Sequence, residues 1–308
     1  MSGRFEDKTH SNIMMCTAVR MLDALQRARW PRHGSKFSNR IYDEHQLLTL
    51  LVLKEQVAKS YREFCVWLEI SPPLQELLGL RKVPHFTTLH KFLLRTGRKV
   101  LERLLPAFLT GHGKLRLAID STGFGPTNAS RYYITVLGHR EDGSGCEWKR
   151  REVRRFLRQT VAVDIASQLV LAMRVTLGPD NDFHELVPTL DKLRKRGLRI
   201  AEVLADKGYD SEENRRFIHL DLKARPVIPL RAGDRPGIKF KGKYRRRDAR
   251  EFDALAYRQR SLVESVHSVI KRRQGSFVRE RSEATQTKQL IIRVLSYNAR
   301  RAAALQRR

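Results

Sequence analysis

Apolar residues follow two different periods along this chain, and the change falls near Gly111. Between about residues 43 and 96 they recur at helical spacing, beginning with the leucines from Leu47 to Leu53. After Gly111 the apolar residues gather in short β-rich runs, which are typical of strands buried on both faces. These runs are 115–120, 160–166, 168–175, 200–206 and 224–230. Helical segments at 184–197 and 211–220 lie between them, so the second half predicts an α/β fold preceded by a small all-helical domain.

Polar residues and breakers predict where several helices begin and end. Asp43 is placed to cap the first leucine-rich helix, and Ser71-Pro72-Pro73 interrupts the helical region because proline lacks an amide donor. A short helix is expected to follow Thr87 or Thr88 as its N-cap and to stop before Gly97.

The last third of the chain predicts a loop and two helices. Residues 231–250 contain Gly, Pro and the basic run 241–250 without an apolar period, which favours a loop. A helix is expected from about Phe252 to Arg273, ended by Gly275, and a final helix from about Glu283 to Leu305.

The charge of the chain points to a polyanionic partner. The 308 residues include 61 Lys and Arg against 33 Asp and Glu, a formal net charge of +28, and the isoelectric point is near 10.7. This balance disfavours an acidic enzyme of small-molecule metabolism and favours nucleic acid, because each phosphate contact releases condensed counterions. Apolar residues make up 41% of the chain, which is enough for a folded core.

Cysteine usage and hydropathy indicate a cytoplasmic location. Cys16, Cys65 and Cys146 form no CxxC element, so a disulfide scaffold or a zinc ribbon is not expected. The first ten residues contain no apolar h-region, and the aliphatic run Leu50 to Leu53 is far too short to span a bilayer. Neither export nor a membrane span is expected.

Two acidic residues follow apolar strands. Asp120 comes after the run LRLAI, and Asp206 comes after IAEVLA. Ligands of open α/β sheets bind at the carboxyl ends of strands, and carboxylates that meet there suit hard cations such as Mg²⁺. The alternative is that each aspartate only caps a turn.

A third acid, Glu264, shares a helix face with two cations and an aromatic ring. At 100° per residue, Tyr257, Arg260, Glu264 and Lys271 fall within an arc of about 60°. The residues expected on the buried side are Leu255, Leu262, Val266 and Val269. This face could hold a metal beside a nucleic-acid backbone; the alternative is a solvated face with ordinary spaced ion pairs.

These motifs together resemble those of the DDE transposases of bacterial and archaeal insertion sequences, in the broad group that includes families four and five. The Y-x2-R-x3-E-x6-K spacing is met by Tyr257, Arg260, Glu264 and Lys271. The stretches IDSTGFG and ADKGYDS are similar to the first and second acidic blocks of that group, in the right order, and 85–93 is similar to its N-terminal helical segment. The likeness covers roughly residues 40 to 305.

The resemblance implies a domain plan and a catalytic triad. It implies a helical N-terminal DNA-binding domain at 1–110, a ribonuclease H-like catalytic domain with basic insertions at 111–280 and a C-terminal helix at 281–308. Asp120, Asp206 and Glu264 would be the catalytic residues and the metal ligands. They would hold two Mg²⁺ ions, with Mn²⁺ possible, for hydrolysis at the element ends and strand transfer into target DNA.

The resemblance and the charge together predict the partners. Tyr257, Arg260 and Lys271 are expected to contact double-stranded DNA, which would be both the terminal inverted repeats and the target. Basic residues at other positions are expected to track the DNA backbone: Arg150, Arg151, Arg154, Arg155, Arg245, Arg246 and Arg247. Joining two ends implies a homodimer on DNA, associated with the nucleoid.

Two other functions are considered. One is a domesticated transposase that binds DNA without catalysis, and the other is a structural RNA-binding protein, against which the ordered acidic motifs argue. Asp164 and Asp182 are weaker candidates for the metal shell, with turn or cap roles as the alternative. His184 and His267 are expected at the surface or in packing, and a stacking role is considered for Trp148.

Overall fold

A mixed β-sheet forms the centre of the computed structural model, which describes residues 12–34, 40–111, 113–127, 156–178, 183–231 and 242–306. The strand order is β3-β2-β1-β4-β5, and β6 pairs with the far end of β1. The strands are β1 (Leu115–Pro126), β2 (Phe156–Asp164), β3 (Val170–Gly178), β4 (Ile200–Ala205), β5 (Arg225–Val227) and β6 (Phe277–Val278). β1, β2 and β3 are antiparallel, whereas β1, β4 and β5 run parallel. This arrangement is consistent with a ribonuclease H-like domain and confirms the expected α/β class.

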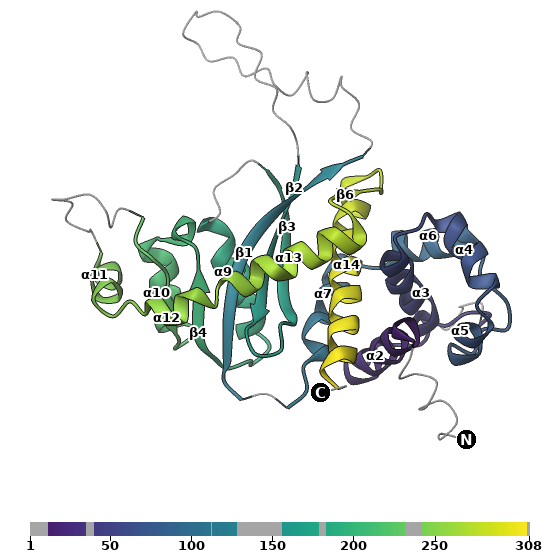
Figure 1. Ribbon diagram of the computed structural model, residues 1–308, viewed down its shortest axis with the longest axis horizontal. Helices are drawn as coiled ribbons and strands as arrows, with labels where there is room; N and C mark the ends of the chain where they lie inside the picture. Colours follow the sequence, from purple (N-terminus) through teal and green to yellow (C-terminus); the bar gives the residue numbers. More distant parts are fainter. Residues whose placement is uncertain are drawn as a thin grey trace, which may run out of the picture.

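Apolar residues on both faces keep β1 in the middle of the sheet. Leu117, Ala118 and Ile119 are all fully buried, as expected for a strand covered on two sides. Helix α9 (Phe183–Arg194) packs on β2 and β3, and α10 (Glu212–Leu220) packs beside β5. Helix α13 (Ser261–Gln274) crosses the face of the sheet that is turned toward the viewer in Figure 1.

The N-terminal helices form a separate layer beside the sheet (Figure 1). They are α2 (Ile13–Arg27), α3 (Glu44–Val57), α4 (Tyr61–Glu69), α5 (Pro72–Leu77), α6 (Phe86–Arg95), α7 (Arg98–Arg103) and the 3₁₀ turn η1 (Leu105–Phe108). Helix α14 (Glu283–Leu305) packs against α2, α3 and α7 and also touches β3. The helical region predicted over 1–110 therefore also includes α14, a helix from the C-terminal part of the sequence.

A buried ion pair ties α3 to α14. The carboxylate of Glu55 lies 2.9 Å from Nε of Arg293 and 2.7 Å from Nζ of Lys54. Burial alone would raise the pKa of Glu55, but the two cations lower it to about 2. Because a single buried charge left without its partner is strongly destabilising, this contact makes the two ends of the chain depend on each other.

Several helix boundaries confirm the predicted signals. Asp43 caps α3 with a complete capping box. The predicted interruption at Ser71-Pro72-Pro73 is confirmed, because α4 ends at Glu69 and a new helix, α5, begins at Pro72, where a missing amide donor costs nothing. Gly275 ends α13 with φ of +90°, a conformation that favours glycine, and α14 begins and ends where the sequence indicates.

Other expectations about local structure were wrong. His85, not Thr87 or Thr88, caps α6 through its ring nitrogen, because the helix begins two or three residues earlier than predicted. The strand expected over 224–230 is only the three-residue β5, and α2 was not foreseen.

Two differences between the predicted and the observed structure lie in the region before and around Glu264. The basic run is not a loop in its described part: residues Lys243–Arg250 form helix α11. The helix expected from Phe252 is divided into α12 (Ala254–Arg258) and α13, and Leu255, predicted to be buried, is 74% exposed. The buried side of α13 is formed by Val263, Val266, His267 and Ile270.

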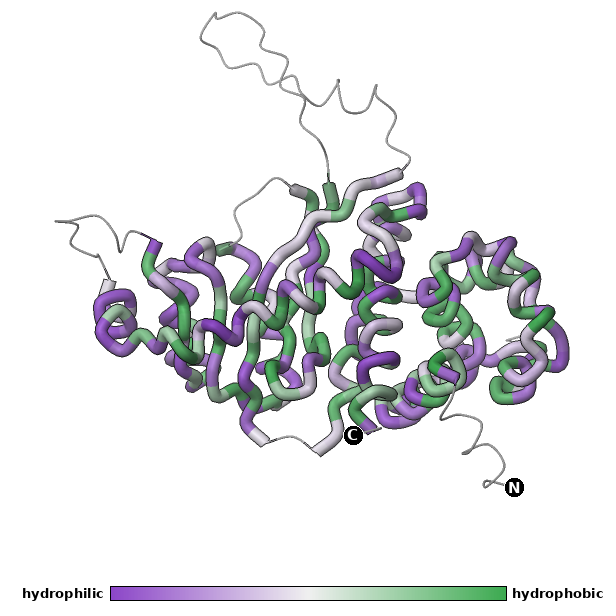
Figure 2. Tube along the Cα trace, in the orientation of Figure 1, coloured by the Kyte–Doolittle hydropathy of each residue, from purple (hydrophilic) through white to green (hydrophobic). Residues whose placement is uncertain are grey.

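Hydropathy along the chain agrees with this layering. Figure 2 shows hydrophobic segments concentrated in the sheet and in the inner helices, and a mainly hydrophilic α11. Within the described ranges, no helix has the length and apolar character needed to cross a bilayer.

Candidate active site

The ladder between β1 and β4 places two of the predicted acids side by side. Ile119 of β1 pairs with Ala205 of β4 in parallel register, so the next residues, Asp120 and Asp206, are neighbours across the sheet. β4 ends at this point, as predicted for Asp206, but β1 continues to Pro126. Asp120 therefore lies within its strand and not at its end, because β2 extends the antiparallel pairing past it.

Asp206 is held by the turn that it begins. Its Oδ1 accepts from the amide of Lys207 at 2.7 Å, which makes it the N-cap of the 3₁₀ turn η2 (Lys207–Tyr209). The hydroxyl of Tyr257 donates to the same oxygen at 3.4 Å. The short helix α12, which precedes the helix that carries the third acid, thus reaches Asp206 through a hydrogen bond.

Glu264 approaches the same place from α13, and Arg260 links it to the sheet. The Arg260 guanidinium lies 2.5 Å from Oε1 of Glu264 and 3.9 Å from Oδ2 of Asp120. The Glu264 side chain is 54% exposed, whereas that of Asp120 is 22% exposed. Asp120 thus has Asp206 beside it in the sheet and is linked to Glu264 through Arg260. We refer to Asp120, Asp206 and Glu264 together with Arg260 as the acidic pocket.

The electrostatics of this pocket are unbalanced. The pKa of Asp120 is raised to about 6, first by burial and further by the negative charges of Glu264 and Asp206. The amide of Ser121 and the charge of Arg260 act in the opposite direction without cancelling these effects. Burial is the largest of these effects, so the surroundings of Asp120 disfavour its charged form.

The carboxylate oxygens of the pocket are suitable ligands for a hard divalent cation. Mg²⁺ and Mn²⁺ prefer such oxygens, and an acid with a raised pKa beside two others has a deficit of positive charge that a cation would meet. In the part of the chain that the structure describes, no three His, Cys, Asp or Glu side chains are close enough to hold a metal as they stand. Arg260, which contacts both Asp120 and Glu264, currently supplies the neighbouring positive charge.

Two cations of the predicted helix face lie against aromatic rings. The Arg260 guanidinium lies 5.8 Å from the centre of the Tyr257 ring, and Nζ of Lys271 lies 5.2 Å from the centre of the Phe124 ring. Burial lowers the pKa of Lys271. Arg260 therefore lies between the acids and an aromatic ring, whereas Lys271 lies over Phe124, further along α13.

The remaining predicted residues divide into three groups. Arg150, Arg151, Arg154, Arg155, Trp148 and Asp182 lie outside the described residues. Arg246 and Arg247 are exposed on α11. The Arg245 guanidinium is directed toward Asp210, with Nη2 2.5 Å from Oδ2, and is largely covered.

The weaker candidates have structural positions. Asp164 accepts from the amide and the hydroxyl of Ser167 at 2.8 and 2.7 Å and so forms the turn between β2 and β3. The ring of His184 lies against that of Phe183. His267 is buried against the sheet, and burial lowers its pKa to about 4, so that its ring is neutral at pH 7.

Sequence reasoning missed a chain of hydroxyls that connects the two acidic strands. Ser121 Oγ lies 2.8 Å from Oγ1 of Thr160 and 2.7 Å from the hydroxyl of Tyr209. Tyr209 is almost fully buried and belongs to the turn that follows Asp206. The sequence signal for this contact was Tyr209 in the stretch ADKGYDS, an aromatic residue with a polar hydroxyl three positions after Asp206.

Comparison with known proteins agrees with this geometry. No curated protein and no solved structure matches the chain. The model of the transposase DDE domain matches residues 111–299, a range that contains all six strands, α13 and all three acids. Because this match covers more than half of the sequence, the chain belongs to the transposase DDE domain family.

Proposed function

We propose that this protein is an insertion-sequence transposase of the group that includes families four and five. It cleaves DNA at the ends of its element and joins the freed 3′-hydroxyls to target DNA. The observation that supports this most directly is the parallel register that makes Asp120 and Asp206 neighbours, with Glu264 opposite them on α13.

Asp120, Asp206 and Glu264 are the proposed catalytic residues and ligands for two Mg²⁺ or Mn²⁺ ions. When bound, such ions supply activation of the attacking oxygen and charge stabilisation of the leaving oxygen. Phosphoryl transfer asks the protein mainly for positioning and charge neutralisation, so three acids suffice without a nucleophilic side chain. Tyr257 orients Asp206 through its hydroxyl, and Arg260 orients Glu264.

DNA binding is proposed for the basic face next to these acids. Tyr257, Arg260 and Lys271 border the pocket and would hold the backbone of the element end, and the helical region over 1–110 would bind further along the duplex. The residues Arg150, Arg151, Arg154 and Arg155 stay predictions for the same role. A homodimer on DNA is proposed because two ends are joined in one reaction.

The test is a cleavage assay with DNA that flanks the gene and carries its inverted repeats. Asp120→Asn, Asp206→Asn and Glu264→Gln are expected to lose Mg²⁺-dependent cleavage while they keep end binding. The matched control is Glu213→Gln, which removes an exposed carboxylate in the first turn of α10 and should cleave like wild type. Full cleavage by any of the three pocket variants would remove that residue from the proposed triad.

A second candidate is a DNA-binding protein derived from a transposase that no longer cleaves. The ion pairs of Arg260 with Asp120 and Glu264 favour it, because they partly neutralise the acids without a metal. A Mg²⁺ titration separates the two candidates, since thermal stability should rise with Mg²⁺ only if the acids bind it. Wild-type protein that binds end DNA but shows neither the shift nor cleavage would establish the second candidate.

A further inference from the structure

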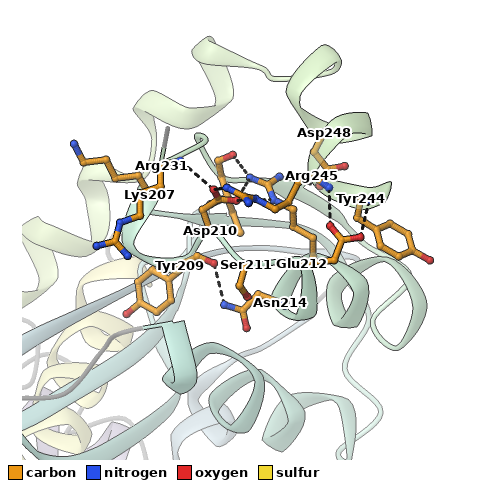
Figure 3. Close-up of polar contacts among 12 residues, drawn as sticks. Lys207, Tyr209, Asp210, Ser211, Glu212, Asn214, Arg231, Tyr244, Arg245 and Asp248 are labelled. Carbon is orange, nitrogen blue, oxygen red and sulfur yellow. Dashed lines mark hydrogen bonds and ion pairs between the residues drawn. The ribbon is translucent and has the colours of Figure 1, made fainter. Parts of the chain in front are cut away.

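The basic helix α11 is attached to the domain by one of its faces. The two carboxylate oxygens of Glu212 accept from the amides of Tyr244 and Arg245 at 2.9 and 3.0 Å, as Figure 3 shows. These amides belong to the first turn of α11, where no partner exists within the helix. A carboxylate there also interacts favourably with the helix dipole. The position of α11 is therefore set by α10.

A buried ion network strengthens this attachment. Arg215 of α10 lies 2.9 Å from Asp248 of α11 and 3.1 Å from Asp210, and the side chains of Arg215 and Asp210 are 0% exposed. Arg245 makes two contacts with Asp210, at 3.1 and 2.5 Å (Figure 3). Burial would raise the pKa of Asp210, but these hydrogen bonds and charges keep it below its usual value. Arg245 and Asp248 thus belong to the anchored face of α11.

The opposite face of α11 is a row of cations. Lys243, Arg246, Arg247 and Arg250 are exposed, and at 100° per residue they fall within an arc of about 100°. Together with Glu251 they surround a surface hollow of about 330 Å³. Glu251 lies 3.5 Å from Arg247, and both are more than half exposed, so this pair neutralises little of the charge.

Two features relate this cationic face to the acidic pocket. Asp210, which holds Arg245, follows Asp206 by four residues on the same connection. Figure 1 shows α11 at one end of the molecule and the N-terminal helices at the other, with the sheet and α13 between them. DNA that reached the pocket could contact each end of the molecule with a different segment.

We propose that the α11 face, defined as Lys243, Arg246, Arg247 and Arg250, binds the phosphate backbone of double-stranded DNA on the side of the pocket away from the N-terminal helices. This inference rests on the proposed function. It assigns different roles to the cations of the basic run 241–250. Arg245 is a positioning residue, and the four exposed cations contact phosphate. Four flexible cations without a shaped pocket for bases read no sequence, so the contact is independent of sequence.

The experiment measures binding of a fluorescein-labelled 30-bp duplex of random sequence by anisotropy at several NaCl concentrations, with Mg²⁺ omitted. The test variant is Lys243→Ala/Arg246→Ala/Arg250→Ala. The slope of log K against log[NaCl] is expected to become shallower by about 2 to 3, since each lost phosphate contact contributes about 0.9. The control, Lys114→Ala/Lys195→Ala/Arg199→Ala, removes the same charge from exposed sites near the other end of the parallel strands and should change the slope little.

The outcomes separate this inference from the proposed function. Equal slopes for the test and control variants would overturn the α11 surface and leave the acidic triad untouched, because the assay involves no cleavage. Equal competition by polyglutamate at matched charge would also overturn it, since the face would then accept any polyanion. Glu213→Gln, which changes an exposed carboxylate that belongs neither to the acidic pocket nor to the α11 face, should bind like wild type. Arg245→Ala should weaken binding through a shifted α11, and Arg245→Lys should restore part of it.

Discussion

Two clusters of carboxylates lie four residues apart on one connection, and they have opposite electrostatic character. Asp210 is completely buried, contacts Arg215 and Arg245, and has a lowered pKa. Asp120, beside Asp206, is partly open to solvent, has its nearest cation, Arg260, at 3.9 Å, and has its pKa raised to about 6. The same residue types therefore form a balanced structural network in one place and an unbalanced pocket in the other.

This difference teaches how to tell a structural acid from a catalytic one. A buried carboxylate that contributes only to folding is surrounded by enough cations and donors to stay charged at little cost. A carboxylate that must bind a cation from solution has to keep a deficit of positive charge, and this deficit lowers the stability of the folded protein. Perturbed pKa values in a pocket are for this reason a guide to function.

The largest expected effect comes from breaking the balanced network. Arg215→Ala leaves Asp210 and Asp248 buried without their shared partner and should lower the free energy of unfolding by about 3–5 kcal/mol. Urea denaturation followed by tryptophan fluorescence measures the change. The control Arg246→Ala, on the exposed face of α11, should stay within about 0.5 kcal/mol of wild type. A loss for Arg215→Ala as small as that of the control would show that the network is dispensable.

The second largest effect is expected in the acidic pocket, where a substitution should increase the free energy of unfolding and not decrease it. The folded-state pKa of Asp120 is raised from 3.8 to about 6, so the folded protein loses stability as pH rises through this interval in metal-free buffer. Asp120→Asn removes this cost and should stabilise the protein at pH 7 by up to about 3 kcal/mol, with the gain vanishing near pH 4. Asp210→Asn, at a carboxylate with a lowered pKa, should instead destabilise at pH 7. A destabilised Asp120→Asn at pH 7 would contradict the unbalanced pocket.

The smallest expected effect is the stabilisation by added Mg²⁺, which should depend on the acidic pocket and not on the network of Arg215. Mg²⁺ at ten times its dissociation constant should raise the free energy of unfolding of the wild type by about 1.4 kcal/mol. Asp120→Asn and Glu264→Gln should lose this increase, because each removes a proposed ligand. Arg215→Ala should keep it under conditions where the variant remains folded, since its network does not face the pocket. A pocket variant that retains the full increase would place the cation elsewhere.

The sequence predicted the pocket better than its surroundings. Order and spacing singled out Asp120, Asp206 and Glu264, and the structure places Asp120 beside Asp206 and links it to Glu264 through Arg260; the catalytic roles of the three acids stay predictions. Spacing also indicated that Tyr257 and Arg260 would share the side of Glu264, and both contact the acids. What spacing could not show was the Arg260 contact with Asp120, which depends on how α13 lies on the sheet.

The errors in prediction share one physical cause. The run that forms α11 has no apolar period, so nothing local indicates a helix, and the helix is instead held by distant charges such as Glu212 and Arg215. Leu255 was expected to be buried because a continuous helix was assumed. The helix is interrupted before α13, and the side chain of Leu255 is exposed to solvent. In the same way His85 replaced the expected threonine caps because tertiary packing of α6 decided where it begins.

The pairing of Glu55 with Arg293 has a consequence for folding during synthesis of the protein. The two residues are separated by 238 positions, so α3 cannot form this ion pair until Arg293 has been synthesised. At usual rates of translation this interval is on the order of 10 to 50 s. Throughout it α2 and α3 lack the surface that α14 covers in the folded protein, so a truncation that removes α14 exposes part of the core of the N-terminal helices.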